Sequence, residues 1–344
     1  MKRSAGIDAL RVASIASVIF AHVYTGPLTH QWIYAWHVPL FFILTGYFWT
    51  PGRAWVSDIR IRARSLVVPY AGWFVVVSAV FLAITALSGR ATLNSLLPAL
   101  MGGSHAQGPF GTFWFVSVLF FTVVLYRAIE RVPNSLQIVV AIGGLGLAYF
   151  DGEFLAGMPF GIGLAVPCLA FVLAGRLLQV IEPRLTNPLV IGILLVFSAG
   201  VAIASIPQQF VDLKVGLFGT PGVGVAIAVA AGTGMILIAR RFPLGTHVSK
   251  LAIRLGVVGI AVVLAHPVVI WAFRTHDVMP KWTLLAAVVL PWTVAMLLTL
   301  TPLSALLVGT KKDASRRARK SAASEHFREQ YTTSPGKSSG NASH

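Results

Sequence analysis

Apolar runs of similar length recur along most of the chain, separated by short polar segments. A helix needs about 20 mainly apolar residues to cross the hydrocarbon core of a bilayer. Runs close to this length cover residues 7–26, 32–49, 66–87, 112–130, 135–150, 159–181, 187–206, 215–239, 251–273 and 283–308. The pattern predicts an all-α integral membrane protein with about ten transmembrane helices.

The basic residues between these runs alternate in a way that predicts the orientation. Lys and Arg in short loops stay on the cytoplasmic side of a membrane. When the helices are threaded in order, the Lys and Arg residues that fall outside are Arg90, Lys214, Arg274 and Lys281, out of 27 in the chain. We therefore expect both termini to be cytoplasmic, in a cell membrane that we expect to be the bacterial cytoplasmic membrane.

Composition excludes a soluble globular class. Hydrophobic residues make up 56% of the chain and the mean hydropathy is +0.79. Charged residues make up only 11%, against about 25% in soluble domains. The net charge is +16, but its basic residues are spread over separate loops, so a nucleic-acid partner is not expected. Anionic lipid headgroups should attract these loops.

The C-terminal end differs from the rest. Residues 310–344 are basic and contain few apolar side chains, a composition that predicts disorder. We divide the chain into a transmembrane domain, 1–309, and a cytoplasmic tail, 310–344. The single cysteine, Cys168, excludes an intrachain disulfide.

Three polar residues interrupt the first apolar run: Asp8, Arg11 and His22. Eleven positions separate Arg11 from His22, close to a whole number of helical turns, so both side chains share one face about 16 Å apart along the axis. Asp8 is three positions before Arg11, a spacing that allows an ion pair.

Ionisable residues inside a spanning helix are costly and usually mark a functional site. Two other interpretations stay open. Arg11 could extend to the interface with Asp8 as its partner, and His22 could make a structural hydrogen bond to another helix.

Further polar residues have two interpretations each. Arg53, Arg60, Arg62 and Arg64 form either an ordinary cytoplasmic loop or a site for a phosphate-bearing cosubstrate, because Arg binds phosphate oxygens in pairs. His37 and Trp114 are interfacial or site residues. Thr45 and Gly46 form a small pair that lets another backbone approach. His266-Pro267 predicts a kink or a site wall, because the proline frees a backbone carbonyl.

Several of these motifs together resemble the membrane-bound acyltransferase 3 family. They are GIDALR with ten residues between Arg11 and His22, then HVPLFFILTGYF, the arginine loop ending in LVVPY, TFWFVSVLF, and His266-Pro267. The resemblance covers Ile7 to about Leu307. It departs from the family at Arg60, Arg62 and Arg64, which stand at alternate positions where the family commonly has two arginines with two residues between them. It departs again at Leu264-Ala265, where the family often has Tyr-Leu or a similar pair before the late histidine.

The family O-acylates sugars and other cell-envelope acceptors, so the resemblance implies an O-acetyltransferase-like enzyme. Acetyl-CoA or another acyl-CoA would be the cosubstrate, no metal would be needed, and a carbohydrate, glycolipid or secondary metabolite would be the acceptor. His22 would be the general base or carry the acyl group, and Asp8 would orient Arg11. The remaining predicted residues are Arg11, Arg60, Arg62 and Arg64 for the acyl-CoA, and His37, Thr45, Trp114 and His266 for the substrate.

A membrane transporter is the alternative, since buried Arg11 and His22 could relay protons or bind a solute. Against it, we find no internal repeat of five plus five helices and no carboxylate within the runs near this site besides Asp8. The residue that would stabilise an oxyanion is not identified by the sequence.

Overall fold

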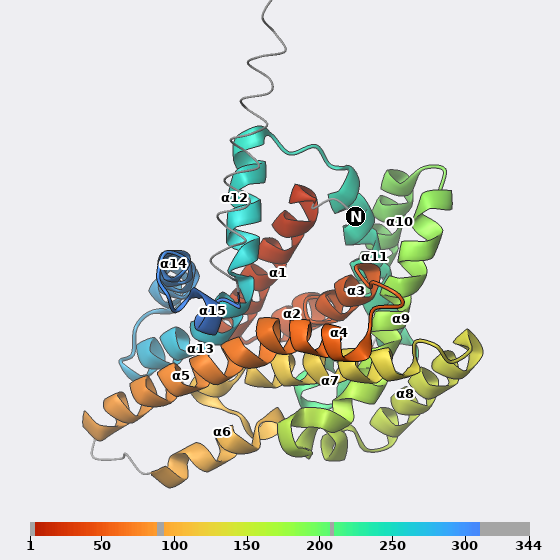
Figure 1. The fold of residues 1–344 in the computed structure, drawn as a ribbon. Coiled ribbons are helices and arrows are strands. Elements are labelled where there is room, and N and C mark those ends of the chain that lie inside the picture. The colour runs from red at the N-terminus through yellow and green to blue at the C-terminus, as the bar shows by residue number, and fades with distance from the viewer. Residues whose placement is uncertain (1–3, 88–92, 207–209, 310–344) are drawn as a thin grey trace, which may run out of the picture.

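The computed structural model describes residues 4–87, 93–206 and 210–309. The predicted tail, 310–344, and Arg90 lie outside the described residues. The regular secondary structure of the described residues is helical except for one small hairpin (Figure 1). This confirms the prediction of an all-α, multi-pass membrane protein, while the orientation of the termini stays a prediction.

The elements follow one another with short connections. The long helices are α1 (Ala5–Val23), α5 (Val68–Leu87), α7 (Phe113–Ile129), α8 (Asn134–Gly157), α9 (Ala165–Ile181), α10 (Pro188–Ser205), α11 (Val223–Arg241), α12 (Thr246–Val257), α13 (Gly259–Thr275) and α14 (Pro280–Leu298). The short ones are α2 (Pro27–Thr29), α3 (Pro39–Tyr47), α4 (Trp55–Arg62), α6 (Leu97–Met101) and α15 (Ser304–Leu307). Short π-helical turns are η1 (His30–Tyr34) and η2 (Ala63–Val67), and 3₁₀ turns are η3 (Leu93–Leu96), η4 (Gly103–His105), η5 (Gly108–Phe110), η6 (Pro159–Leu164), η7 (Glu182–Arg184) and η8 (Leu213–Val215). The hairpin pairs β1 (Val211–Asp212) with β2 (Leu217–Phe218) in antiparallel register.

Eight helical segments among the described residues are long and apolar enough to cross a membrane, and a ninth is formed if α12 and α13 count as one span bent by 69°. The sequence predicted ten. The difference lies in residues 32–49, which form no continuous spanning helix. The π-helical turn η1 and a turn precede α3, which begins at Pro39. Proline has no N–H to continue a helix from the preceding turn, so it favours a new start there.

The first helix packs at the centre of one group of helices. It contacts α11, α12, α13 and α14, and Figure 1 shows α1 running beside α12. The neighbouring α3 packs against α9 with their backbones in close approach. A Cβ on Gly46 would lie 1.9 Å from the backbone oxygen of Val172, and one on Gly175 would lie 1.9 Å from that of Ile43. The predicted role of Gly46 in close packing is therefore confirmed.

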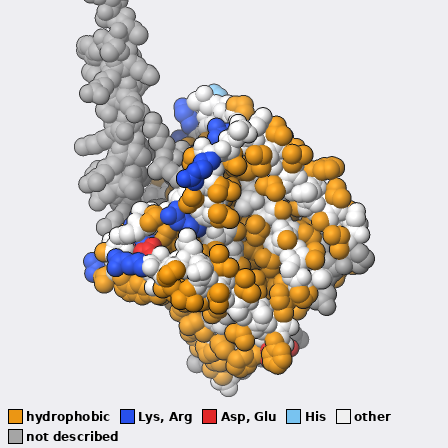
Figure 2. All heavy atoms as spheres, turned by 90° about the vertical axis from the view of Figure 1, so that its right-hand side faces the viewer, with side chains coloured by type: hydrophobic (Ala, Val, Ile, Leu, Met, Phe, Trp, Pro, Cys, Tyr) orange, Lys and Arg blue, Asp and Glu red, His pale blue; other side chains and the backbone are white. Residues whose placement is uncertain are grey.

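The side that carries α8, α9 and α10 in Figure 1 is seen face-on in Figure 2. Hydrophobic side chains cover most of this face, and Lys and Arg side chains gather along one edge of it (Figure 2). Large apolar side chains point outward here, among them Ile142 on α8, Leu177 on α9 and Phe197 on α10. An exposed apolar surface of this extent is what a lipid-facing wall requires.

Candidate active site

Two cavities lie along α1, one toward each end of the helix. One has a volume of about 70 Å³ and contains His22, and we call it the His22 cavity. The other has a volume of about 220 Å³ and contains Arg11, and we call it the Arg11 cavity. Polar and aromatic side chains of the His22 cavity include Tyr34, His37, Thr112, Trp114, Asp212 and Lys214.

A thin partition separates the two cavities. Phe41, Phe115 and Val263 line both of them. The rings of Phe41 and Phe115 pack with their centroids 5.4 Å apart. A ligand that reached from one cavity to the other would therefore have to displace the two phenylalanine rings and the valine side chain.

A hydrogen-bond chain holds the His22 imidazole. His266 Nδ1 lies 3.0 Å from the backbone oxygen of Val262, and because a carbonyl only accepts, this nitrogen carries the proton. In a neutral ring His266 Nε2 must then accept, and it lies 3.1 Å from His22 Nδ1. His22 Nδ1 is thus the donor, and the lone pair of the neutral His22 ring is on Nε2.

The proline after His266 links this chain to the partition. Pro267 lies inside α13 and has no N–H, so the carbonyl of Val263, four residues earlier, loses its helical donor. The hydroxyl of Thr112 donates to this oxygen at 2.7 Å. This hydrogen bond joins the start of α7 to α13 where the two cavities meet. The carbonyl that the sequence predicted to be free of its helical partner is thus hydrogen-bonded to Thr112.

His37 and Trp114 both line the His22 cavity. The His37 ring is fixed by donation from Nδ1 to the backbone oxygen of Ile33 at 2.6 Å. Its own backbone oxygen accepts from the hydroxyl of Ser14 on α1 at 3.1 Å. The second imidazole of the cavity is therefore held against the same helix that carries His22.

The hairpin places a lysine side chain at the His22 cavity. Lys214, on η8 between β1 and β2, lines the cavity and donates from Nζ to the backbone oxygen of Ala106 at 2.7 Å. Burial lowers the pKa of Lys214, and the nearby Asp212 carboxylate acts in the opposite direction. Gly216 turns the chain back with φ of 78° and packs against Gly152 of α8, so the hairpin is fixed to the bundle.

The Arg11 cavity holds two guanidiniums. Arg11 Nη1 lies 3.2 Å from Asp8 Oδ1, and the Arg11 side chain is 36% exposed while that of Asp8 is 1% exposed. The guanidinium also sits 5.3 Å from the ring centroid of Phe48. Arg62 lines the same cavity, whereas Arg60 and Arg64 are exposed and do not.

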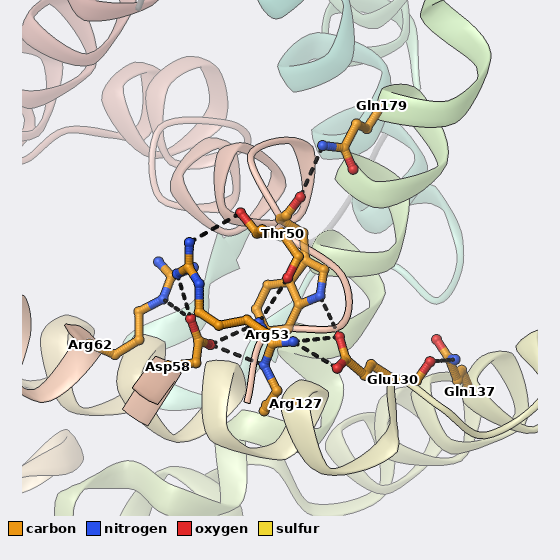
Figure 3. A network of polar contacts seen from close by, with 9 residues as sticks. Thr50, Arg53, Asp58, Arg62, Arg127, Glu130, Gln137 and Gln179 are labelled. Carbon is orange, nitrogen blue, oxygen red and sulfur yellow. Dashed lines mark hydrogen bonds and ion pairs between the residues drawn. The ribbon is translucent and has the colours of Figure 1, made fainter. Parts of the chain in front are cut away.

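A buried ion-pair network positions Arg62, as Figure 3 shows. Asp58 accepts from Arg53 Nη1 at 2.8 Å and from Arg127 Nη2 at 3.0 Å. Arg62 Nε lies 3.9 Å from the same carboxylate, too far for a hydrogen bond, and has no hydrogen-bond partner among the described residues. Arg127 in turn donates to both oxygens of Glu130. Arg62 thus retains a buried donor beside the cavity.

A family model for an acyltransferase domain, that of the acyltransferase 3 family, matches residues 4–309. The chain belongs to this family. No curated protein and no solved structure matches the acyltransferase. The resemblance predicted from the sequence motifs is confirmed, and family membership implies transferase activity, which favours an enzyme over the transporter alternative.

The structure of the acyltransferase distributes the predicted residues between its two cavities. His22, His37 and Trp114 line one cavity, and Arg11, Thr45 and Arg62 line the other. The remaining predicted residues lie elsewhere: His266 is fully buried behind His22, Arg60 and Arg64 are exposed, and Asp8 contacts Arg11. Asp8 is 14 positions before His22, or about 21 Å along the helix. Asp8 is therefore far from the His22 cavity, and it is linked to the Arg11 cavity through its ion pair with Arg11.

Sequence reasoning missed three residues of the acyltransferase. Lys214 was counted only as a basic residue of an outer loop, and Asp58 and Arg127 were not singled out. Their spacing in the sequence does not mark them, because Lys214 contacts Ala106 and Asp58 contacts Arg127 only through the packing of elements that are distant in the chain. A cation in an outer connection was the one available hint.

Proposed function

We propose that the protein transfers an acyl group, most simply acetyl, from an acyl-CoA to a hydroxyl of a carbohydrate or related cell-envelope acceptor, with His22 as the general base. The observation that carries the proposal is the chain from Val262 through His266 to His22, which leaves His22 Nε2 as a lone-pair acceptor inside a cavity. A neutral imidazole with a lone pair on Nε2 can accept the proton of a hydroxyl.

The donor would enter at the Arg11 end. Basic residues cluster there, which supports the cytoplasmic side as its source. The phosphates of CoA would bind Arg11 and Arg62, because both guanidiniums line one cavity and the N–H of Arg62 Nε has no hydrogen-bond acceptor in the described part of the chain. The pantetheine arm would follow α1 for about 16 Å, part Phe41 from Phe115, and present the thioester to His22.

The acceptor would occupy the His22 cavity from the opposite end. His22 Nε2 takes the hydroxyl proton as the oxygen attacks the thioester carbon, and the carbonyl electrons move onto its oxygen. The Lys214 ammonium, which lines the same cavity, would stabilise this oxyanion. When the intermediate collapses, the C–S bond breaks and the CoA thiolate takes the proton from the His22 imidazolium, giving the ester and free CoA.

The test compares His22→Ala with His247→Ala in membranes that hold equal amounts of each protein. His247 is exposed on α12 and lines neither cavity. The membranes receive acetyl-CoA labelled in the acetyl group together with envelope glycans and secreted metabolites of a strain that lacks the protein. Mass spectrometry then detects alkali-labile label on the acceptors. We expect transfer by the wild type and by His247→Ala and none by His22→Ala. Transfer that survives in His22→Ala would remove His22 as the base.

A further inference from the structure

A third cavity, larger than the other two, lies outside the candidate active site. It occupies about 510 Å³ between α8 and α9 and shares no lining residue with the His22 or Arg11 cavities. We call it the α8–α9 groove. Its volume is in the range of small-molecule binding sites and far exceeds the roughly 30 Å³ that one water occupies.

The groove arises from the way the two helices cross. They touch at Gly144, where an added Cβ would lie 2.6 Å from Val166 Cγ1 and 2.9 Å from the backbone nitrogen of Pro167. From this crossing toward the start of α8 the side chains between the helices are small, and Ala141, Ala170 and Ala174 all line the groove. Small side chains leave the space between the helices unfilled.

The walls of the groove are apolar and open outward. Ile138, Ile142 and Leu177 line it and are 51%, 63% and 60% exposed. They belong to α8 and α9, which lie on the hydrophobic side of the molecule seen in Figure 2. In a bilayer, an apolar channel open on this side takes up hydrocarbon chains rather than water.

One end of the groove is polar and carries an unmatched cation. Glu130 lies there, but its carboxylate accepts from Arg127 and from Trp49 Nε1, so its charge is already matched. Arg176 also lines this end, and it forms no ion pair with a carboxylate within the described ranges. Its Nη1 donates to the neutral side chain of Gln179. The groove therefore combines an apolar channel with one available guanidinium.

We propose that the α8–α9 groove binds an anionic phospholipid, with the phosphate on Arg176 and one acyl chain along the alanine-lined channel. A guanidinium binds phosphate oxygens in a bidentate manner, and basic pockets between transmembrane helices bind anionic lipid headgroups. A zwitterionic lipid fits the channel equally well but carries a second cation that the Arg176 end does not match. The proposal does not depend on acyl transfer.

The experiment measures lipid retention by native mass spectrometry on the purified full-length protein. The protein is exposed to equal amounts of phosphatidylglycerol and phosphatidylcholine with identical acyl chains. The wild type should retain the anionic lipid about tenfold better, the value expected for one charge-assisted contact. Arg176→Gln should lose this preference. The matched control is Arg184→Gln, since Arg184 lies near the same end but donates to the backbone oxygen of Val180 and does not line the groove.

A second variant tests the channel without touching the charge. Ala174→Leu fills the groove, and it should lower retention of both lipids while thermal unfolding shows that the protein is folded. Inorganic phosphate at millimolar concentration should displace little lipid, because it lacks the chain. Equal retention of both lipids by the wild type would overturn the proposal. Equal losses of anionic-lipid retention in Arg176→Gln and Arg184→Gln would also overturn it, as would full lipid retention in Ala174→Leu. Displacement of the lipid by phosphate alone, or a second copy of the chain bound at the groove in place of lipid, would do the same.

Discussion

The imidazoles of His22 and His266 lie 3.1 Å apart, from Nδ1 to Nε2, although 244 positions separate the two residues in the chain. The contact of α1 with α13 brings them together. His266 is fully buried and lines neither cavity, so its contact with the site is through His22. In the proposed reaction it is a positioning residue that sets which nitrogen of His22 would accept the proton.

Removing the hydrogen-bond acceptor that His266 provides for His22 should therefore lower the rate of acyl transfer rather than the binding of acyl-CoA. In His266→Phe, His22 Nδ1 loses its partner and the ring is free to place its proton on Nε2. We expect kcat for acyl transfer to fall about 100-fold, within the range of general-base contributions, with the KM for acyl-CoA little changed. His266→Gln, whose amide oxygen can accept the same hydrogen bond, should recover part of the loss. A rise in KM with kcat preserved would contradict the positioning role.

The arginine loop offers a comparison within one short segment. Arg62 lines the Arg11 cavity, and its buried Nε has no hydrogen-bond partner among the residues that the structure describes, while Arg60 and Arg64 are exposed. Arg62→Ala should raise the KM for acyl-CoA about tenfold or more, as expected for one charged hydrogen bond. Arg60→Ala and Arg64→Ala are the matched controls and should leave it near the wild-type value. Steady-state kinetics over a series of acyl-CoA concentrations measure this, and equal effects of all three substitutions would remove Arg62 as the specific ligand.

Lys214 should determine the alkaline side of the pH profile. Burial lowers the pKa of Lys214, so with rising pH it loses its proton earlier than an ordinary lysine, and the stabilising charge beside His22 is lost. We expect kcat to fall on the alkaline side for the wild type. In Lys214→Arg the fall should move to higher pH, because a guanidinium stays protonated. Lys214→Met should lower kcat at every pH. A KM effect on the acceptor alone would instead indicate a binding role.

Features that depend on one helix alone, such as the relation of Arg11 to His22 and the positions of most spanning helices, could be predicted from the sequence. Arg11 and His22 share a helix, so their spacing follows from helix geometry alone. Most spans follow from the length of their apolar runs. The interruption before Pro39 was missed because residues 32–49 are apolar enough to span, and hydropathy does not register a change from a π-helical turn to a new helix.

Contacts between distant elements could not be predicted from one sequence. His266 was expected at the substrate, yet it lies behind His22, because the packing of α1 on α13 decides which way its ring faces. Lys214 reaches the cavity through the hairpin, whose two-residue strands are too short to give a periodic signal. Arg60 and Arg62 lie on α4 and Arg64 lies on η2, and the packing of these elements leaves Arg62 beside the cavity and the other two exposed.

Asp58 should contribute more to stability than any exposed carboxylate. Its side chain is 1% exposed and that of Arg127 is 2% exposed, and the two are joined by hydrogen bonds of 3.0 and 3.1 Å. In Asp58→Asn the buried guanidinium of Arg127 keeps Glu130 as its one anionic partner within the described ranges. Removing one member of a buried ion pair costs about 3–5 kcal/mol, and we expect the lower end because Glu130 remains.

The measurement is thermal or denaturant unfolding of the purified protein in one detergent, with Glu153→Gln as the control because Glu153 is exposed on α8. Asp58→Asn should unfold at clearly lower temperature or denaturant concentration than Glu153→Gln, which should match the wild type. At a temperature where both variants are folded, Asp58→Asn should also bind acyl-CoA more weakly, because the carboxylate that attracts Arg62 has lost its charge. Equal stability of the two variants would show that the network in Figure 3 does not hold this end of the bundle together.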